Sequence, residues 1–201
     1  LAAVLAAFAL AACSNTSNVA SGANAEGLLK ALAAAAQAVT LSDADVMQLA
    51  DKSCAEMDAK AKVASAKGKS AQRLARLVKG MPKEVEGVTL NYKVYETREI
   101  NAWAMNNGCV RVYSGLMEKM NDNELRGVIG HEIGHVAPGH SKKAMQVAYA
   151  AGAARQAAAS AGNSAVAALT ASEIGDLAEK LVNAQFSQAQ ETEADDYAFD
   201  L

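Results

Sequence analysis

The spacing of apolar residues predicts helices in the first 81 residues of the chain. These helices are expected over residues 26–38, 42–66 and 69–81. Ser42, with Asp45 three residues later, is typical of a capping box that begins the second helix. In the third helix, Leu74, Leu77 and Val78 form one apolar stripe, which indicates a helix packed on one side.

The spacing then changes to the alternation expected of β-strands. Strands are predicted over residues 88–96, 100–105 and 109–113. In the first of them, Val88, Leu90, Tyr92 and Val94 lie on one face. The sequence Asn106-Asn107-Gly108 separates the other two strands and is typical of a hairpin turn. This part of the chain therefore predicts a small three-stranded sheet.

Helical spacing returns after the sheet. Helices are predicted over residues 115–120, 124–136 and 172–201. Asn121 and Glu124 have the spacing of a capping pair at the start of the middle helix. Residues 141–171 are small, polar and rich in alanine without a clean stripe, which leaves either a helix pair or a mobile flap. The chain is therefore predicted to be an α+β protein, mostly helical, with a small sheet.

Composition supports the helical prediction and excludes two classes of protein. Alanine accounts for 47 residues, whereas Phe, Trp and Tyr together account for nine, and alanine is the strongest helix former. The 19 basic residues are balanced by 22 acidic ones, so the net charge of −3 excludes a strongly basic nucleic-acid-binding protein. No run in the sequence reaches the roughly 18 apolar residues of a membrane-spanning helix.

The beginning of the chain resembles an export signal. Residues 1–12 are apolar and uncharged, a length that fits part of a signal peptide and is too short to cross a bilayer. The pattern Leu10-Ala11-Ala12-Cys13 resembles a bacterial lipobox, which predicts that Cys13 is lipidated and anchors the protein to a membrane. The alternative is an apolar helix that ends at an ordinary buried cysteine.

Three segments follow from this pattern. They are a partial lipoprotein signal peptide over residues 1–12, a flexible linker over residues 13–25, and one folded domain over residues 26–201. Ser14 stands where retention in the bacterial inner membrane usually requires Asp. We therefore expect a lipoprotein of the outer membrane of a Gram-negative bacterium, facing the periplasm.

An exported location changes the interpretation of the two remaining cysteines. Cys54 and Cys109 form an even pair in an oxidising compartment, which predicts one disulfide. Two free buried thiols are one alternative. Cys109 as a metal ligand is another, although the chain has no CxxC spacing to support it.

All three histidines fall within the string HEIGHVAPGH. His131 and His135 are four residues apart, about 40° of rotation on a helix, so both imidazoles point to one place, as two zinc ligands require. Glu132 lies beside the first ligand, in the position of a general base that takes a proton from an attacking water. The alternative is a helix whose histidines face solvent.

A catalytic zinc ion needs a third protein ligand. A metzincin would have Gly at position 138 and His at position 141, whereas this chain has Pro138 and Ser141, so that class is excluded. The acidic cluster at residues 191–196 offers a carboxylate instead, although such a run is by itself typical of a solvated face. Glu191 and Asp195 share a helix face, so one could bind the metal while the other orients a ligand histidine.

These motifs resemble those of a known family. HEIGH followed by ETEAD resembles the HExxH and ExxAD pair of the HtpX-like and CAAX-prenyl-protease-type zinc metallopeptidases, which are gluzincins. The stretch NAWAMNNGCVRVYSGLM resembles the strand segment that precedes the catalytic helix in that family. The resemblance implies a zincin-like metallopeptidase domain, mostly helical, with the small sheet beside the HExxH helix.

The resemblance also assigns roles to residues. It implies one zinc ion per chain on His131, His135 and Glu191, and it selects Glu191 over Glu193. It makes Glu132 the general base and Asp195 a support for a ligand histidine. Members of the family continue into further helices that carry a later oxyanion-stabilising residue, often His, so we expect either that the domain extends beyond this sequence or that another group takes this role.

His140 also recurs in the family, but we do not expect it to bind the metal. At five residues past His135 it leaves the ligand face, and Pro138 should bend the helix before it. A histidine near the end of a helix is more often a cap.

The strand before the catalytic helix is expected to bind substrate. In zincins an extended peptide adds as a strand to the sheet edge beside the metal. Asn101 matches the Asn-Ala pair of the family and would help to hold the scissile carbonyl, with Ala102 and Trp103 beside it. The alternative for Trp103 is an ordinary core position.

Two functions remain at this point. The first is a lipid-anchored zinc endopeptidase that cleaves misfolded or misassembled envelope proteins. The second is a non-catalytic envelope scaffold or chaperone-like lipoprotein with a structural zinc ion. An open coordination position and Glu132 favour the enzyme, because a structural site has four protein ligands and needs no base.

Overall fold

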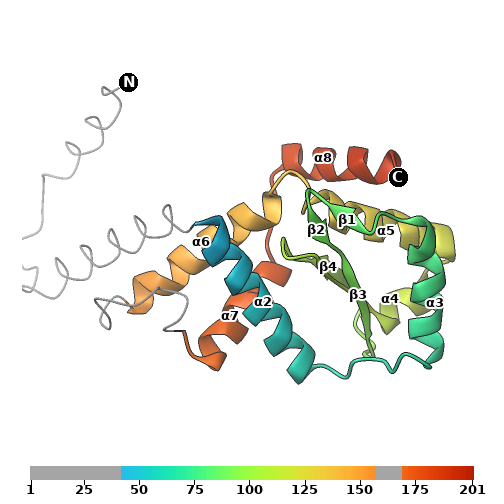
Figure 1. The fold of residues 1–201 in the computed structure, drawn as a ribbon, viewed down its shortest axis with the longest axis horizontal. Coiled ribbons are helices and arrows are strands. Elements are labelled where there is room, and N and C mark those ends of the chain that lie inside the picture. The colour runs from blue at the N-terminus through green and yellow to red at the C-terminus, as the bar shows by residue number, and fades with distance from the viewer. Residues whose placement is uncertain (1–41, 157–168) are drawn as a thin grey trace, which may run out of the picture.

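The computed structural model describes residues 42–156 and 169–201 (Figure 1). The predicted leader, Cys13, the linker and the helix over residues 26–38 lie outside these ranges. The helices are α2 (Asp43–Lys60), α3 (Lys69–Leu77), the short 3₁₀ helix η1 (Val78–Gly80), α4 (Ser114–Lys119), α5 (Asp122–Gly134), α6 (His140–Gln156), α7 (Ala171–Val182) and α8 (Gln188–Phe199). Within the described ranges, none of these helices combines the length and apolarity needed to cross a bilayer.

The strands form two small sheets. They are β1 (Glu84–Val85), β2 (Val88–Thr89), β3 (Asn91–Tyr95), β4 (Ala102–Ala104) and β5 (Cys109–Tyr113). The larger sheet has the order β3-β5-β4, with β3 parallel and β4 antiparallel to β5. The predicted α+β class and the small three-stranded sheet are therefore confirmed, including the hairpin that joins β4 to β5.

Several boundaries differ from the sequence prediction. The capping box at Ser42 is present, but α2 ends at Lys60 because Ala61 is already extended. The strand predicted over residues 88–96 is interrupted at Leu90, because β2 turns back to pair with β1. The turn between them is formed by Glu86 and Gly87, both with positive φ.

The prediction of a single helix over residues 172–201 is wrong. The chain forms two helices, α7 and α8, with residues 183–187 between them. Asn183 ends α7, and Ser187 begins α8 in a capping box with Gln190. These local hydrogen bonds satisfy some of the backbone groups left free at the two helix ends, which favours the break. The first part of the alanine-rich segment forms α6.

The larger sheet lies between two apolar clusters. Figure 1 shows α2, α6 and α7 on one side of the sheet and α3, α4 and α5 on the other. Every residue of β5 is buried, and its side chains alternate: Val110 and Val112 belong to one cluster, whereas Cys109 and Tyr113 belong to the other. The sheet is therefore fixed from both faces, and β4 is left as its edge beside α5.

A disulfide and a buried ion pair join α2 to the sheet. Cys54 and Cys109, the pair expected from the sequence, form a disulfide. Next to it, the Arg111 guanidinium is 1% exposed and forms two hydrogen bonds to Asp58, at 2.7 and 2.9 Å. Burial raises the pKa of Asp58, but hydrogen bonds from Arg111, Lys93 and Tyr95 outweigh burial and lower the pKa to about 2.

Replacing Asp58 by Asn should destabilise the protein, because Arg111 would remain buried without its counter-charge. We expect a loss of about 3 kcal/mol in the free energy of unfolding at pH 7, measured by urea denaturation. Since the pKa of Asp58 is lower in the folded protein than the ordinary 3.8, this stabilisation is present above pH 3.8 and is lost as the pH falls through 2. The difference between wild type and D58N should therefore narrow over that interval.

The matched control is Glu96→Gln, which removes a carboxylate that pairs with Lys62, whose side chain is 79% exposed. Exposed pairs contribute little, so E96Q should change the unfolding free energy by less than about 1 kcal/mol. Equal losses in D58N and E96Q would contradict the role given to the buried pair.

Candidate metal centre

Helix α5 places the two histidines of the HExxH motif on one face. The predicted capping box is present, with Asn121 as N-cap and Glu124 at the third helical position. His131 lies within the helix, and His135 follows its last residue while its backbone remains right-handed helical. The Nε2 atoms of His131 and His135 are 3.1 Å apart.

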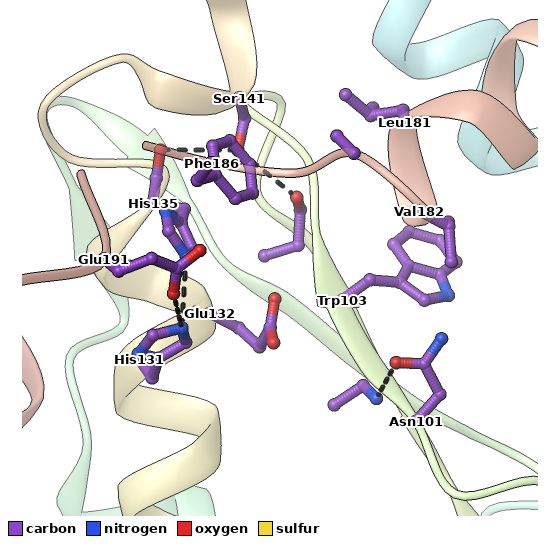
Figure 2. A pocket seen from close by; sticks show the side chains of 13 residues that line it. Asn101, Trp103, His131, Glu132, His135, Ser141, Leu181, Val182, Phe186 and Glu191 are labelled. Carbon is purple, nitrogen blue, oxygen red and sulfur yellow. Dashed lines mark hydrogen bonds and ion pairs between the residues drawn. The ribbon is translucent and has the colours of Figure 1, made fainter. Parts of the chain in front are cut away.

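Helix α8 brings a carboxylate to the same point. Oε2 of Glu191 lies 3.4 Å from Nε2 of His131 and 3.8 Å from Nε2 of His135. Figure 2 shows the three side chains converging on one point at the wall of a cleft. A tetrahedral zinc ion with bonds of about 2.0–2.1 Å separates its ligand atoms by about 3.3 Å. The spacing and chemistry of these three groups therefore fit zinc.

Two glycines allow α8 to approach α5 closely enough for this contact. A Cβ atom added at Gly134 would lie 2.7 Å from the carbonyl oxygen of Ala194, a distance that real Cβ atoms do not tolerate. One turn earlier, a Cβ at Gly130 would lie 3.2 Å from Cα of Ala198. The helices pack backbone against backbone here, and this packing sets the position of Glu191.

Asp195 lies beside the first histidine. Its Oδ1 atom is 2.8 Å from Nδ1 of His131. A proton on Nδ1 then points to the carboxylate, and the Nε2 lone pair is free to face Glu191 and the metal position. Asp195 is therefore placed to orient His131, as the family resemblance implied for a ligand histidine.

His140 begins the helix that follows the HExxH helix. Gly139 has a φ of +78°, which lets the chain reverse, so that His140 is the first residue of α6. Its Nδ1 atom lies 3.3 Å from Nδ1 of His135, and its Nε2 atom lies 2.9 Å from Glu193. The group of candidate metal ligands does not include His140.

Phe186 is a residue of the site that the sequence prediction missed. It lies in the segment between α7 and α8, and its ring stacks on His135 with centroids 3.9 Å apart and planes 17° apart. The sequence predicts one continuous helix over residues 172–201 and gives Phe186 no role in the site. The spacing of Ser187 and Gln190 is a capping-box signal that could have revealed the break.

Glu132 faces the cleft beside the ligands. Figure 2 shows its carboxylate between the ligand group and β4. Burial and then the charge of Glu191 raise its pKa to about 8, and a backbone hydrogen bond with Ala104 opposes this. Burial, together with the nearby His131 and His140, lowers the pKa of His135 to about 4. His135 is therefore neutral at pH 7, as a metal ligand must be.

The edge strand forms another wall of the same cleft. Asn101, Ala102 and Trp103 line it, as does Ala104. Asn101 Oδ1 accepts a hydrogen bond from the Ala102 N–H at 2.9 Å (Figure 2). The Trp103 residue is only 3% exposed, and its ring packs edge-on against Tyr95, so most of this side chain belongs to the core.

Comparison with known proteins agrees with this geometry. A model of the family described as peptidase family M48 matches residues 68–201. The chain belongs to peptidase family M48. The resemblance of its motifs to those of HtpX-like metallopeptidases is therefore confirmed, and the chain is a protease.

Two relatives of this M48 chain are similar over most of its length. Metalloprotease LoiP of Escherichia coli is 54% identical over 178 residues, which cover 89% of this chain and 70% of LoiP. Metalloprotease YcaL of the same species is 53% identical over 165 residues, which cover 82% of this chain and 65% of YcaL. Protease HtpX of Acinetobacter baylyi is 60% identical over only 37 residues, 18% of this chain and 12% of HtpX.

In this M48 domain, Gly134→Ala should weaken metal binding. The added methyl group meets the backbone of α8, which must move and carry Glu191 away from the histidines. Overpacking of this kind also costs about 1–3 kcal/mol of stability. Zinc affinity measured by competition with a chromogenic chelator, together with urea unfolding, tests both effects.

Gly127 on the same helix is the matched control, because a Cβ added there meets nothing within 4 Å. Gly127→Ala should leave zinc affinity unchanged and stabilise the helix by up to about 1 kcal/mol. If G134A bound zinc as tightly as G127A, the close approach of α8 would not be what places Glu191.

Proposed function

We propose that this chain is a zinc-dependent endopeptidase with Glu132 as its general base. The observation that carries the proposal is that His131, His135 and Glu191 converge at the wall of a cleft that Glu132 also lines. Three protein ligands leave a tetrahedral ion one open position, as catalytic rather than structural zinc sites do.

When bound, the zinc ion would polarise the scissile carbonyl and make water a better nucleophile. Glu132 accepts a proton from the attacking water and returns it to the departing amine. The charge of a bound zinc ion would lower the pKa of Glu132 and favour the carboxylate form that accepts this proton. The β4 wall of the cleft holds the peptide so that the scissile carbonyl of the peptide faces Glu132.

We propose that the substrate is an unfolded segment of protein. β4 pairs with β5 on one side only, and its other edge faces the cleft through Ala102 and Ala104. An extended peptide can add to such an edge through backbone hydrogen bonds, which require no particular side chain. Folded proteins rarely offer a free extended strand, so misfolded or misassembled envelope proteins fit this site best.

We also propose that the protein is anchored through Cys13 to the outer membrane and faces the periplasm. The lipobox-like pattern before Cys13 supports the anchor. The disulfide between Cys54 and Cys109 supports an exported location, since such bonds persist in oxidising compartments.

The decisive test of the enzymatic proposal is Glu132→Gln, assayed in the full-length protein with zinc content measured in parallel. The variant keeps the three metal ligands, so zinc content should stay unchanged. Cleavage of unfolded casein should fall by at least about 100-fold, because the proton acceptor is lost. A chelator should abolish cleavage by the wild type, and added zinc should restore it.

If wild type and E132Q bind zinc equally and neither cleaves casein, the peptidase proposal fails. The non-catalytic scaffold with a structural zinc ion would then account for the site.

The anchor is tested by Cys13→Ser in the full-length protein produced in bacteria. The wild type should partition into detergent and carry acyl chains detectable by mass spectrometry, and C13S should remain in the aqueous phase. A wild-type protein without acyl chains would refute lipidation while leaving the enzymatic proposal untouched.

A further inference from the structure

The two ligand histidines are supported in different ways. His131 lies within hydrogen-bond distance of the carboxylate of Asp195. His135 has a second imidazole beside its outer nitrogen instead, with Nδ1 of His140 at 3.3 Å. The other nitrogen of His140 lies 2.9 Å from Oε2 of Glu193. A chain of two hydrogen bonds therefore runs from the Glu193 carboxylate to the second ligand.

The direction of these hydrogen bonds follows from the chemistry of the ligand. His135 can offer its Nε2 lone pair to a metal only if its proton is on Nδ1. That proton is donated to Nδ1 of His140, which must then be the acceptor. The proton of His140 therefore lies on Nε2, and Glu193 accepts it. One assignment of protons satisfies all three groups.

The residues around His135 and His140 hold this chain of hydrogen bonds in place. His135 and His140 are 4% and 6% exposed, whereas the Glu193 side chain is 59% exposed, so the chain runs from the surface to the ligand. Ser141 donates to the His135 carbonyl from its backbone N–H at 3.1 Å and from its hydroxyl at 3.3 Å. Phe186 covers the face of the His135 ring.

We infer that Glu193 and His140 are positioning residues that hold His135 in the orientation and tautomer needed for metal binding. Glu193 acts on His135 indirectly, through His140, whereas Asp195 acts directly on His131. Helix α8 then supplies three carboxylates with separate tasks, of which Glu191 alone is placed to touch the metal. This inference rests on the proposed zinc site, and it gives Glu193 a role distinct from that of Glu191.

The test is the zinc dissociation constant of the full-length protein, measured by competition with a chromogenic chelator. Glu193→Ala removes the acceptor and should weaken zinc binding about tenfold, the lower end of the range for supporting residues of this kind. Glu193→Gln keeps a carbonyl oxygen that accepts from His140, so it should stay within about threefold of wild type. Glu193 is exposed enough that the folding of both variants should be unaffected.

Asp196→Ala is the matched control. It removes one negative charge from the same helix, and within the described part of the chain its side chain forms no hydrogen bond or ion pair. Its zinc affinity should equal that of wild type. Affinities of E193A and D196A that agree would overturn the inference. So would equal losses in E193A and E193Q, because these would indicate a general effect of charge.

A double-mutant cycle tests whether Glu193 acts through His140. His140→Ala should weaken zinc binding, and adding E193A to it should cause no further loss. Additive losses would mean that Glu193 acts independently, which would overturn the proposed chain. If H140A does not fold, the comparison of E193A, E193Q and D196A still decides.

Failure of this inference is distinguishable from failure of the proposed function. A wild type that binds no zinc refutes the metal site and the inference together. A wild type that binds zinc and cleaves casein, with E193A unchanged in affinity, refutes only the role of Glu193 and His140.

Discussion

The site depends on the contact between the backbones of α5 and α8 at Gly134 and Ala194. The HExxH motif supplies two candidate ligands from one helix, which is a local property of the chain. The third candidate ligand, Glu191, comes from a helix that is distant in sequence, and it reaches the histidines only because no Cβ atom separates the two backbones at Gly134. The same approach brings Asp195 within hydrogen-bond distance of His131. Loss of this contact would therefore affect the ligand and its neighbours together.

The sheet fixes the other side of the site. β4 is held against β5, and β5 is buried on both faces and tied to α2 through the disulfide and through Arg111. The edge that faces the cleft is thus attached to a strand that is buried along its whole length and linked covalently to α2.

Features that depend on residues close together in the sequence could be predicted. The capping boxes at Ser42 and Asn121 and the spacing of His131 and His135 depend on neighbouring residues, so the sequence alone identified them. Contacts that depend on chain reversals were not predictable in the same way. The approach of His140 to His135 requires the left-handed backbone of Gly139, and the stacking of Phe186 on His135 requires the break between α7 and α8.

The disulfide and the candidate metal site each close a separate loop of the chain. The disulfide closes a loop from Cys54 to Cys109, with 55 residues of separation, around α3 and the strands. A metal on His135 and Glu191 would close a second loop of nearly equal size, around α6 and α7. The two loops do not overlap. The disulfide restricts the unfolded chain over the first loop, whereas a metal that binds only the folded protein would stabilise the native closure of the second.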